Sequence, residues 1–143
     1  MLSILGNIIW FLMGGCIMAL AWFLVGCIMA ISIVGLPWAR SAFVIAKFCL
    51  VPFGRTLIRR DVLTGQKDIG TSAPGFIGNI IWFVLAGWWL CVGHVLSGLA
   101  CCVTIIGIPW GWQHLKIAAM TLAPIGMSVV DIDVAENLTY RNG

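Results

Sequence analysis

Charged residues are scarce in this sequence, and their scarcity argues against an ordinary water-soluble domain. Only 9% of the residues are charged and 62% are hydrophobic, whereas a soluble domain carries roughly 25% charged and about 45–50% apolar residues. A protein surface in water needs polar and charged side chains, and this chain has too few of them to cover one. We therefore expect most of its side chains to face lipid.

The charges are absent from two long blocks. No charged residue occurs between Ile4 and Ala39, and the block from Phe76 to Trp112 is also uncharged, apart from the ionisable His94. A helix needs roughly 20 consecutive apolar residues to cross a membrane, so both blocks are long enough. The first run lacks a preceding basic segment and exceeds the roughly 7–15 apolar residues of a signal peptide, so we do not expect a cleavable leader.

Groups that carry catalysis are lacking as well. The acidic residues are confined to the middle segment and the tail, and the sequence shows no nucleophile–base set, paired carboxylates or glycine-rich phosphate loop. We therefore predict no enzymatic activity, no catalytic residue and no cofactor. The formal net charge of +3 is too small and too scattered to indicate nucleic-acid binding.

One unit occurs twice in the chain. The run GNIIWF that starts at Gly6 recurs at Gly78, an offset of 72 residues, and the same offset relates GLPW at Gly35 to GIPW at Gly107. No gap is needed along this alignment. Chance similarity between apolar segments would not keep asparagine, proline and glycine in register, so the chain contains an internal repeat.

Each unit is predicted to contain an apolar helical block, a break and a shorter helix. Proline removes a backbone donor and clashes with the preceding turn, and glycine relaxes the backbone. The predicted helix breaks are therefore the glycines and prolines at equivalent places in the two units: Gly35, Pro37, Gly107 and Pro109. The shorter helices are expected at about 38–50 and 110–122.

Basic side chains lie on these shorter helices. Arg40 and Lys47 are seven residues apart and share a stripe, and Lys116 lies on the second helix. A narrow basic stripe on an apolar helix is typical of a helix at the membrane surface. We predict that Arg40, Lys47 and Lys116 contact lipid headgroups or an anion.

The fold class that follows is an all-α integral membrane protein of two tandem repeats. Its predicted parts are a first membrane repeat, a polar linker, a second membrane repeat and a polar tail, at 1–55, 56–75, 76–127 and 128–143. Arginine and lysine in the linker favour the cytoplasmic side. In the tail, Val129, Val130 and Ile132 suggest a short strand or an ordered segment.

The number of membrane crossings is open at this stage. A block of about 35 residues would form a helix of about 50 Å, longer than the hydrocarbon core of about 30 Å. We favour a hairpin of two short passes within each block, which keeps every basic residue on one side. The alternative is one long tilted pass per unit, which makes the two repeats inverted.

Tryptophans and cysteines complete the composition. Eight tryptophans are many for this length, and we expect them to anchor the helices at the membrane interface. The six cysteines lie within or beside the apolar blocks, where cysteine behaves as a small hydrophobic residue. Cys91 precedes His94 by three positions, but a metal site needs further ligands, so we predict none.

The ordered motifs of the two units resemble a known family. The second unit has GWWL from Gly87, then His94, IIGIP from Ile105 and KIAA from Lys116, and it closely resembles the YccF family of bacterial inner-membrane proteins. The first unit, with LVPFG from Leu50, resembles the opening copy of that family. The resemblance covers nearly the whole chain and implies a multi-pass protein of the bacterial inner (plasma) membrane, built from two copies of one small domain. It implies no particular activity.

Polar residues inside the apolar blocks are the candidate functional residues. Asn7, Asn79 and His94 are predicted either to line a pathway or to form hydrogen bonds between helices. One chain has too few helices to enclose a pathway, so we expect a homo-oligomer in the lipid bilayer. The leading hypothesis is a homo-oligomeric channel or transport component. The alternative is a non-conducting accessory or scaffold subunit that binds another membrane protein through its linker and tail.

Overall fold

A computed structural model describes residues 2–142, which fold as two copies of one helical unit. The first copy consists of α1 (Leu2–Trp10), a π-helical turn η1 (Phe11–Gly15), α2 (Cys16–Ile31), α3 (Leu36–Leu50) and β1 (Arg55–Arg59). The second copy repeats this order with α5 (Ala73–Trp82), η3 (Phe83–Gly87), α6 (Trp88–Cys102), a short turn η4 (Ile105–Gly107), α7 (Ile108–Leu122) and β2 (Met127–Asp131). The predicted all-α membrane class with two tandem repeats is confirmed, with a two-stranded sheet in addition.

The linker and the tail are ordered elements as well. They contribute α4 (Arg60–Thr64), a 3-10 turn η2 (Ile69–Thr71) and α8 (Ile132–Asn142). The strand suggested for the tail is present as β2. The linker, which we expected to be a plain exposed connection, supplies most of β1, the strand that pairs with it.

Each apolar block forms one bent helix. The first runs from Leu2 to Ile31 and the second from Ala73 to Cys102, and both helices, of 30 residues each, are long and apolar enough to cross a membrane. In the first copy the bend lies at Gly14, whose φ of +123° is strained for any residue with a side chain. The predicted hairpin within each block is therefore wrong, because the wide π turn bends the helix without reversing it.

The chain reverses at the predicted breaks. α3 begins at Leu36 with Pro37 in its first turn, where a missing N–H leaves no intrahelical bond unmade. Pro109 holds the same place in α7. Gly35 lies so close to α2 that a Cβ there would be 2.8 Å from the carbonyl oxygen of Met29. The reversal therefore brings α3 back along α2, and α7 back along α6.

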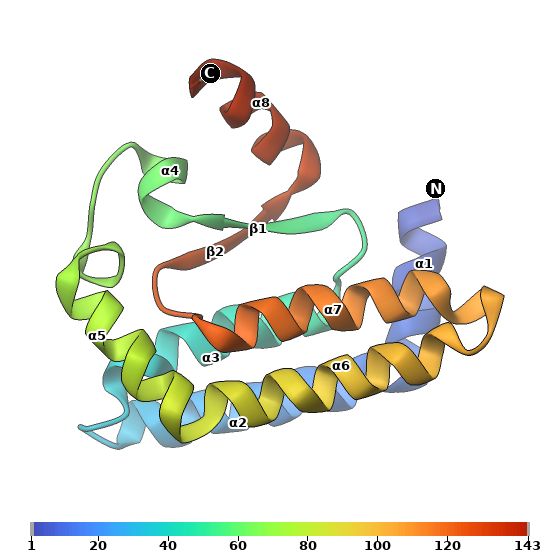
Figure 1. Ribbon diagram of the computed structural model, residues 1–143, viewed down its shortest axis with the longest axis horizontal. Coiled ribbons are helices and arrows are strands. Elements are labelled where there is room, and N and C mark those ends of the chain that lie inside the picture. The colour runs from blue at the N-terminus through green and yellow to red at the C-terminus, as the bar shows by residue number, and fades with distance from the viewer. Residues whose placement is uncertain (1, 143) are drawn as a thin grey trace.

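The two helical hairpins pack against each other through α3 and α7 (Figure 1). The sheet lies across α3 and α7 on the side away from α2 and α6, and α1 and α5 rise toward the sheet side at opposite ends of the molecule. Ile45, Phe48 and Ile117 are at most 1% exposed, so α3 and α7 form the centre of the fold. By contrast, α2 and α6 leave most of their apolar side chains exposed, which suits a surface in contact with lipid.

The sheet reveals how the two copies are related. β1 and β2 pair antiparallel, with Leu57 opposite Val129, its own counterpart in the repeat. This register exchanges the two strands by a twofold rotation about an axis through the sheet. Two backbone hydrogen bonds beside the sheet obey the same symmetry: Arg60 N–H to Gly126 O at 2.8 Å and Ile132 N–H to Gly54 O at 3.1 Å.

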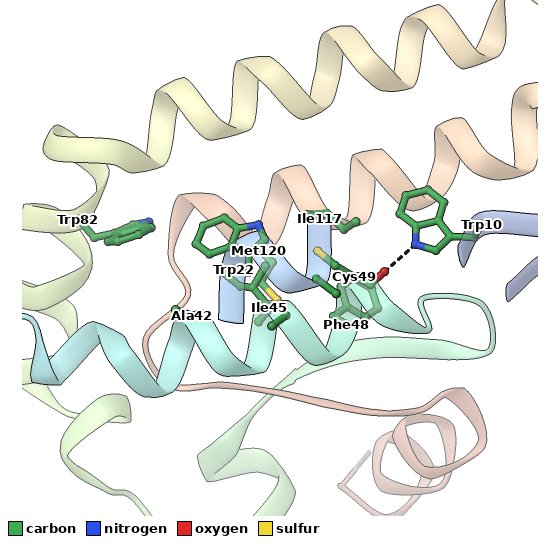
Figure 2. Close-up of a cluster of buried hydrophobic side chains, with 11 residues drawn as sticks. Trp10, Trp22, Ala42, Ile45, Phe48, Cys49, Trp82, Ile117 and Met120 are labelled. Carbon is green, nitrogen blue, oxygen red and sulfur yellow. Dashed lines mark hydrogen bonds between the residues drawn. The ribbon is translucent and has the colours of Figure 1, made fainter. Parts of the chain in front are cut away.

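Three tryptophans lie in the shared core (Figure 2). Trp10, Trp22 and Trp82 are buried. The Trp10 indole N–H donates to the Cys49 carbonyl oxygen at 2.6 Å, and Trp82 donates to that of Thr121 at 2.8 Å. The expectation that tryptophans serve as interface anchors is wrong for these three, because their rings fill the interior.

Candidate functional site

Two histidines meet in the interior of the second copy. His94 on α6 and His114 on α7 place their Nδ1 atoms 3.2 Å apart, with ring centroids 5.5 Å apart. Both side chains are partly buried. A neutral imidazole has one donor and one acceptor nitrogen, so in this contact one Nδ1 donates and the other accepts. The contact exists because α7 folds back along α6.

A side chain of the first copy also packs against this histidine pair. The Trp10 ring centroid lies 5.0 Å from that of His114, and a small cavity of about 160 Å³ beside them is lined by Met13, Met18 and Cys101, among others. The histidines therefore lie in a mostly apolar environment, where an ionisable group is unusual and often functional.

The equivalent place in the first copy is filled without any ionisable group. Trp22 corresponds to His94, and Ala42 corresponds to His114. The Trp22 ring packs on Trp82, with centroids 6.3 Å apart. One copy thus fills this space with a large and a small side chain, and the other with two of intermediate size. Dense packing alone accounts for the exchange of volume, but not for the choice of two titratable rings.

The chemistry open to this pair is proton sharing or hydrogen bonding. Among residues 2–142, His, Cys, Asp and Glu side chains do not gather in any group of three or more that would hold a metal ion. Cys91, three residues before His94, is therefore not part of such a group. The sequence pattern pointed to His94 and not to His114, because His114 lies on a different helix. Aligning the two units at an offset of 72 residues could have identified the pair, because Trp22 and Ala42 of the first unit are both replaced by histidine in the second.

The two asparagines occupy equivalent corners. The Asn7 amide donates to the Phe53 carbonyl oxygen at 3.1 Å and accepts from the Phe53 N–H at 2.9 Å. Asn79 makes the same two bonds with Ile125, at 3.0 and 2.9 Å. Each amide fastens the start of a long helix to the corner that follows the shorter helix. These are hydrogen bonds between elements of one chain, and both amides are partly buried.

The three predicted cations have different surroundings. Arg40 and Lys47 are exposed on α3, and Arg40 lines a groove at the start of that helix. Lys116 is partly buried, and its Nζ donates to the Arg55 carbonyl oxygen at 3.1 Å. That bond ties α7 to β1, so the ammonium group already has a partner within the chain.

The polar end of the molecule has its own charge network. We call β1, β2, α4, η2 and α8 the cap. Arg60 holds Asp68 in a bidentate ion pair, with Nη2 to Oδ1 at 3.0 Å. Hydrogen bonds from Arg60 lower the pKa of Asp68 well below its usual range, and the Thr71 N–H adds to that effect. Arg59 likewise lowers the pKa of Asp61 through a 2.7 Å ion pair.

These observations define a class of protein: a small membrane protein made of one helical unit used twice about a twofold axis. The inner membrane component domain of the YccF family matches residues 5–55 and again 77–127. The chain is 40% identical over 137 residues to the inner membrane proteins YccF of Escherichia coli (strain K12) and Shigella flexneri, covering 95% of this chain and 93% of each relative. No solved structure matches the chain.

The chain therefore belongs to the YccF family. It is a protein of the bacterial inner membrane, as the sequence predicted.

Proposed function

We propose that the protein is a non-enzymatic scaffold subunit of the inner membrane, which binds another membrane protein through its cap. The observation that carries this proposal is the assembly of the cap itself. The linker and the tail lie far apart in the sequence, yet they pair through β1 and β2 into one polar unit on one side of the helices (Figure 1). An ordered polar surface of this kind is suited to protein binding.

The cap also exposes apolar side chains in a symmetric arrangement. Val62 on α4 and Val134 on α8 occupy equivalent positions of the repeat, and they are 44% and 43% exposed. α4 and α8 contact each other. Apolar side chains within a polar rim are a common feature of protein interfaces, so these valines mark the part of the cap that we expect a partner to cover.

The polar side chains inside the helices support the same proposal. Asn7 and Asn79 bond to backbone groups of their own chain, and His94 bonds to His114. A pore made by several copies would need a polar stripe that faces the neighbouring subunits. These three side chains instead have partners within one chain, which favours a subunit that does not conduct.

Photocrosslinking in native bacterial membranes tests the scaffold proposal. A photoreactive amino acid is placed at Val62 or at Val134, and at Leu20 and Leu96 on the exposed faces of α2 and α6 as matched controls. We expect one discrete protein adduct from both cap positions, identified by mass spectrometry, and lipid adducts from the two control positions. Adducts only to other copies of this chain, from any position, would contradict the proposal.

A homo-oligomeric channel or transport component is the second candidate, and the His94–His114 pair is the observation that favours it. Ionisable residues within membrane helices often belong to proton or ion pathways. Purified protein in liposomes distinguishes the two candidates. If the protein is a scaffold subunit, no ion flux should be measured. If it is a channel, flux should be measured, and the double substitution His94→Trp and His114→Ala should abolish it with assembly intact.

A further inference from the structure

A groove of about 590 Å³ lies where the starts of α3 and α5 meet the linker. This volume is within the range of about 300–1,000 Å³ typical of ligand sites. Exposed apolar side chains dominate its lining: Leu36, Ile69, Ile77 and Ile81. Two arginines, Arg40 and Arg60, complete it. The groove therefore combines a mostly apolar lining with two basic side chains.

One of the two arginines in the groove is not neutralised by the chain. Arg60 pairs with Asp68, but Arg40 forms neither a hydrogen bond nor an ion pair with any residue in the range 2–142. The described residues that line the groove include no acidic side chain. The first turns of α3 and α5 also line it, and the N-terminal end of a helix carries partial positive charge. The groove is thus complementary to an anion.

The equivalent place in the repeat has different side chains. This counterpart across the twofold axis has Phe53 where the groove has Ile125. The Phe53 ring packs edge-on against Trp110, with centroids 6.0 Å apart. The counterpart also has Trp112 where the groove has Arg40. The larger ring at Phe53 and the uncharged Trp112 therefore distinguish this place from the groove.

We propose that the groove binds one anionic phospholipid, with an acyl chain along the apolar wall of α5 and the phosphate group at Arg40. The planar guanidinium of arginine matches a phosphate through two parallel hydrogen bonds. A lipid is the occupant that uses both parts of the groove, since a free anion would leave the apolar wall uncovered. The inner-membrane location of the family provides such lipids around the protein. The inference does not depend on the scaffold or the channel proposal.

Native mass spectrometry of the purified full chain in an uncharged detergent tests the inference. The protein is titrated separately with phosphatidylglycerol, phosphatidylcholine and inorganic phosphate. We expect one retained phosphatidylglycerol, weaker retention of phosphatidylcholine and no retained phosphate. Equal retention of the two lipids would overturn the proposal that the groove selects an anionic lipid, and binding of phosphate alone would identify a site for a free anion.

Two substitutions separate the charge from the apolar wall. Arg40→Gln should lower phosphatidylglycerol retention about tenfold, the loss expected for one charge-assisted contact, and lower phosphatidylcholine retention less, because the choline cation already neutralises the phosphate of that lipid. Ile125→Phe introduces the residue that the other copy already accommodates, and it should lower retention of both lipids. Lys67→Gln, which removes an exposed linker charge outside the groove, is the matched control. Wild-type retention in both Arg40→Gln and Ile125→Phe would refute the inference.

Discussion

The two copies of the unit share their backbone joints and differ in what fills the space around them. In both copies an asparagine fastens the corner after the shorter helix, and a tryptophan donates to the end of that helix. Near these positions, one copy has Trp22 and Ala42 where the other has His94 and His114, and the two histidines place their Nδ1 atoms 3.2 Å apart. The comparison indicates that the shared hydrogen bonds maintain the fold of both copies, while the side chains packed between them can differ.

Substitution of the two asparagines should give the largest loss of stability. Asn7→Leu and Asn79→Leu each remove two hydrogen bonds and leave one backbone N–H and one C=O unpaired. Each variant should lower the free energy of unfolding by about 2–4 kcal/mol, because unsatisfied buried polar groups carry the full penalty of desolvation. Reversible unfolding in mixed micelles, followed by circular dichroism, measures the loss.

The losses of unfolding free energy caused by Asn7→Leu and Asn79→Leu should agree within about 1 kcal/mol if the two corners are equivalent, because each substitution removes the same two hydrogen bonds from its own copy. Asn137→Ala, which changes an exposed amide in α8, is the control and should have almost no effect. A large loss for one asparagine and none for the other would mean that the two corners do not serve the same purpose.

Substitutions at the His94–His114 pair should give the next largest loss of stability. His94→Trp alone introduces a larger ring beside His114 and should destabilise the fold by about 1–3 kcal/mol through overpacking. Adding His114→Ala recreates the pair found in the first copy and should recover most of that loss. The coupling between the two substitutions is read from a double-mutant cycle of unfolding free energies.

The opposite exchange is the matched control for this cycle. Trp22→His should leave a cavity, and Ala42→His should partly fill it, so this pair should also be coupled. Strictly additive effects in both cycles would show that the two places are not interchangeable, and the histidines would then have to be explained by something other than packing.

Much of the fold could be predicted from the sequence because its signals are local or repeated. The breaks at Gly35 and Pro37 act on their own turn of backbone, and an offset of 72 residues identifies the second copy without any knowledge of contacts. The bend at Gly14 could not be predicted, since a glycine in an apolar run is equally compatible with a tilt, a kink or a reversal.

The candidate site was harder to predict because it depends on contacts between helices. His94 stands out in the sequence as an ionisable residue in an apolar block, but its partner His114 becomes apparent only when α7 folds back along α6. Burial of Trp10 was missed for the same reason, because its acceptor at Cys49 belongs to a helix much later in the chain.

The bends differ between the copies and give a smaller effect. Gly14 has a φ of +123°, with no atom within 4 Å of the place where a Cβ would stand. Its counterpart is Ala86, so the second copy bends without a left-handed residue. Gly14→Ala should therefore destabilise the fold by about 1–2 kcal/mol through backbone strain alone.

Ala86→Gly is the matched variant, and it should lower the free energy of unfolding by only about 0.5–1 kcal/mol, through the greater freedom of glycine in the unfolded chain. Both are measured by the same unfolding titration. A neutral result for Gly14→Ala would show that the first bend relaxes readily to the geometry of the second.

The smallest effect concerns the cap, where Arg60 on the linker side pairs with Asp68 at the start of η2. Arg60 lowers the pKa of Asp68, so the carboxylate stabilises the folded cap fully above its ordinary pKa of about 3.9. That contribution is lost as the pH falls below this value toward the folded pKa. The Thr71 N–H, which donates to Asp68 at 3.0 Å, should then lose part of its protection against exchange with solvent.

Hydrogen exchange measured between pH 5 and pH 2, and corrected for the intrinsic rate at each pH, checks this expectation. Asp68→Asn should remove the pH dependence at Thr71, because the amide side chain does not titrate. The Ile132 N–H, which donates to the Gly54 carbonyl oxygen on the other side of the twofold axis, is the internal reference. If protection against exchange falls equally at Thr71 and Ile132, the cap opens as one unit. Protonation of Asp68 would then destabilise the whole cap and not the linker alone.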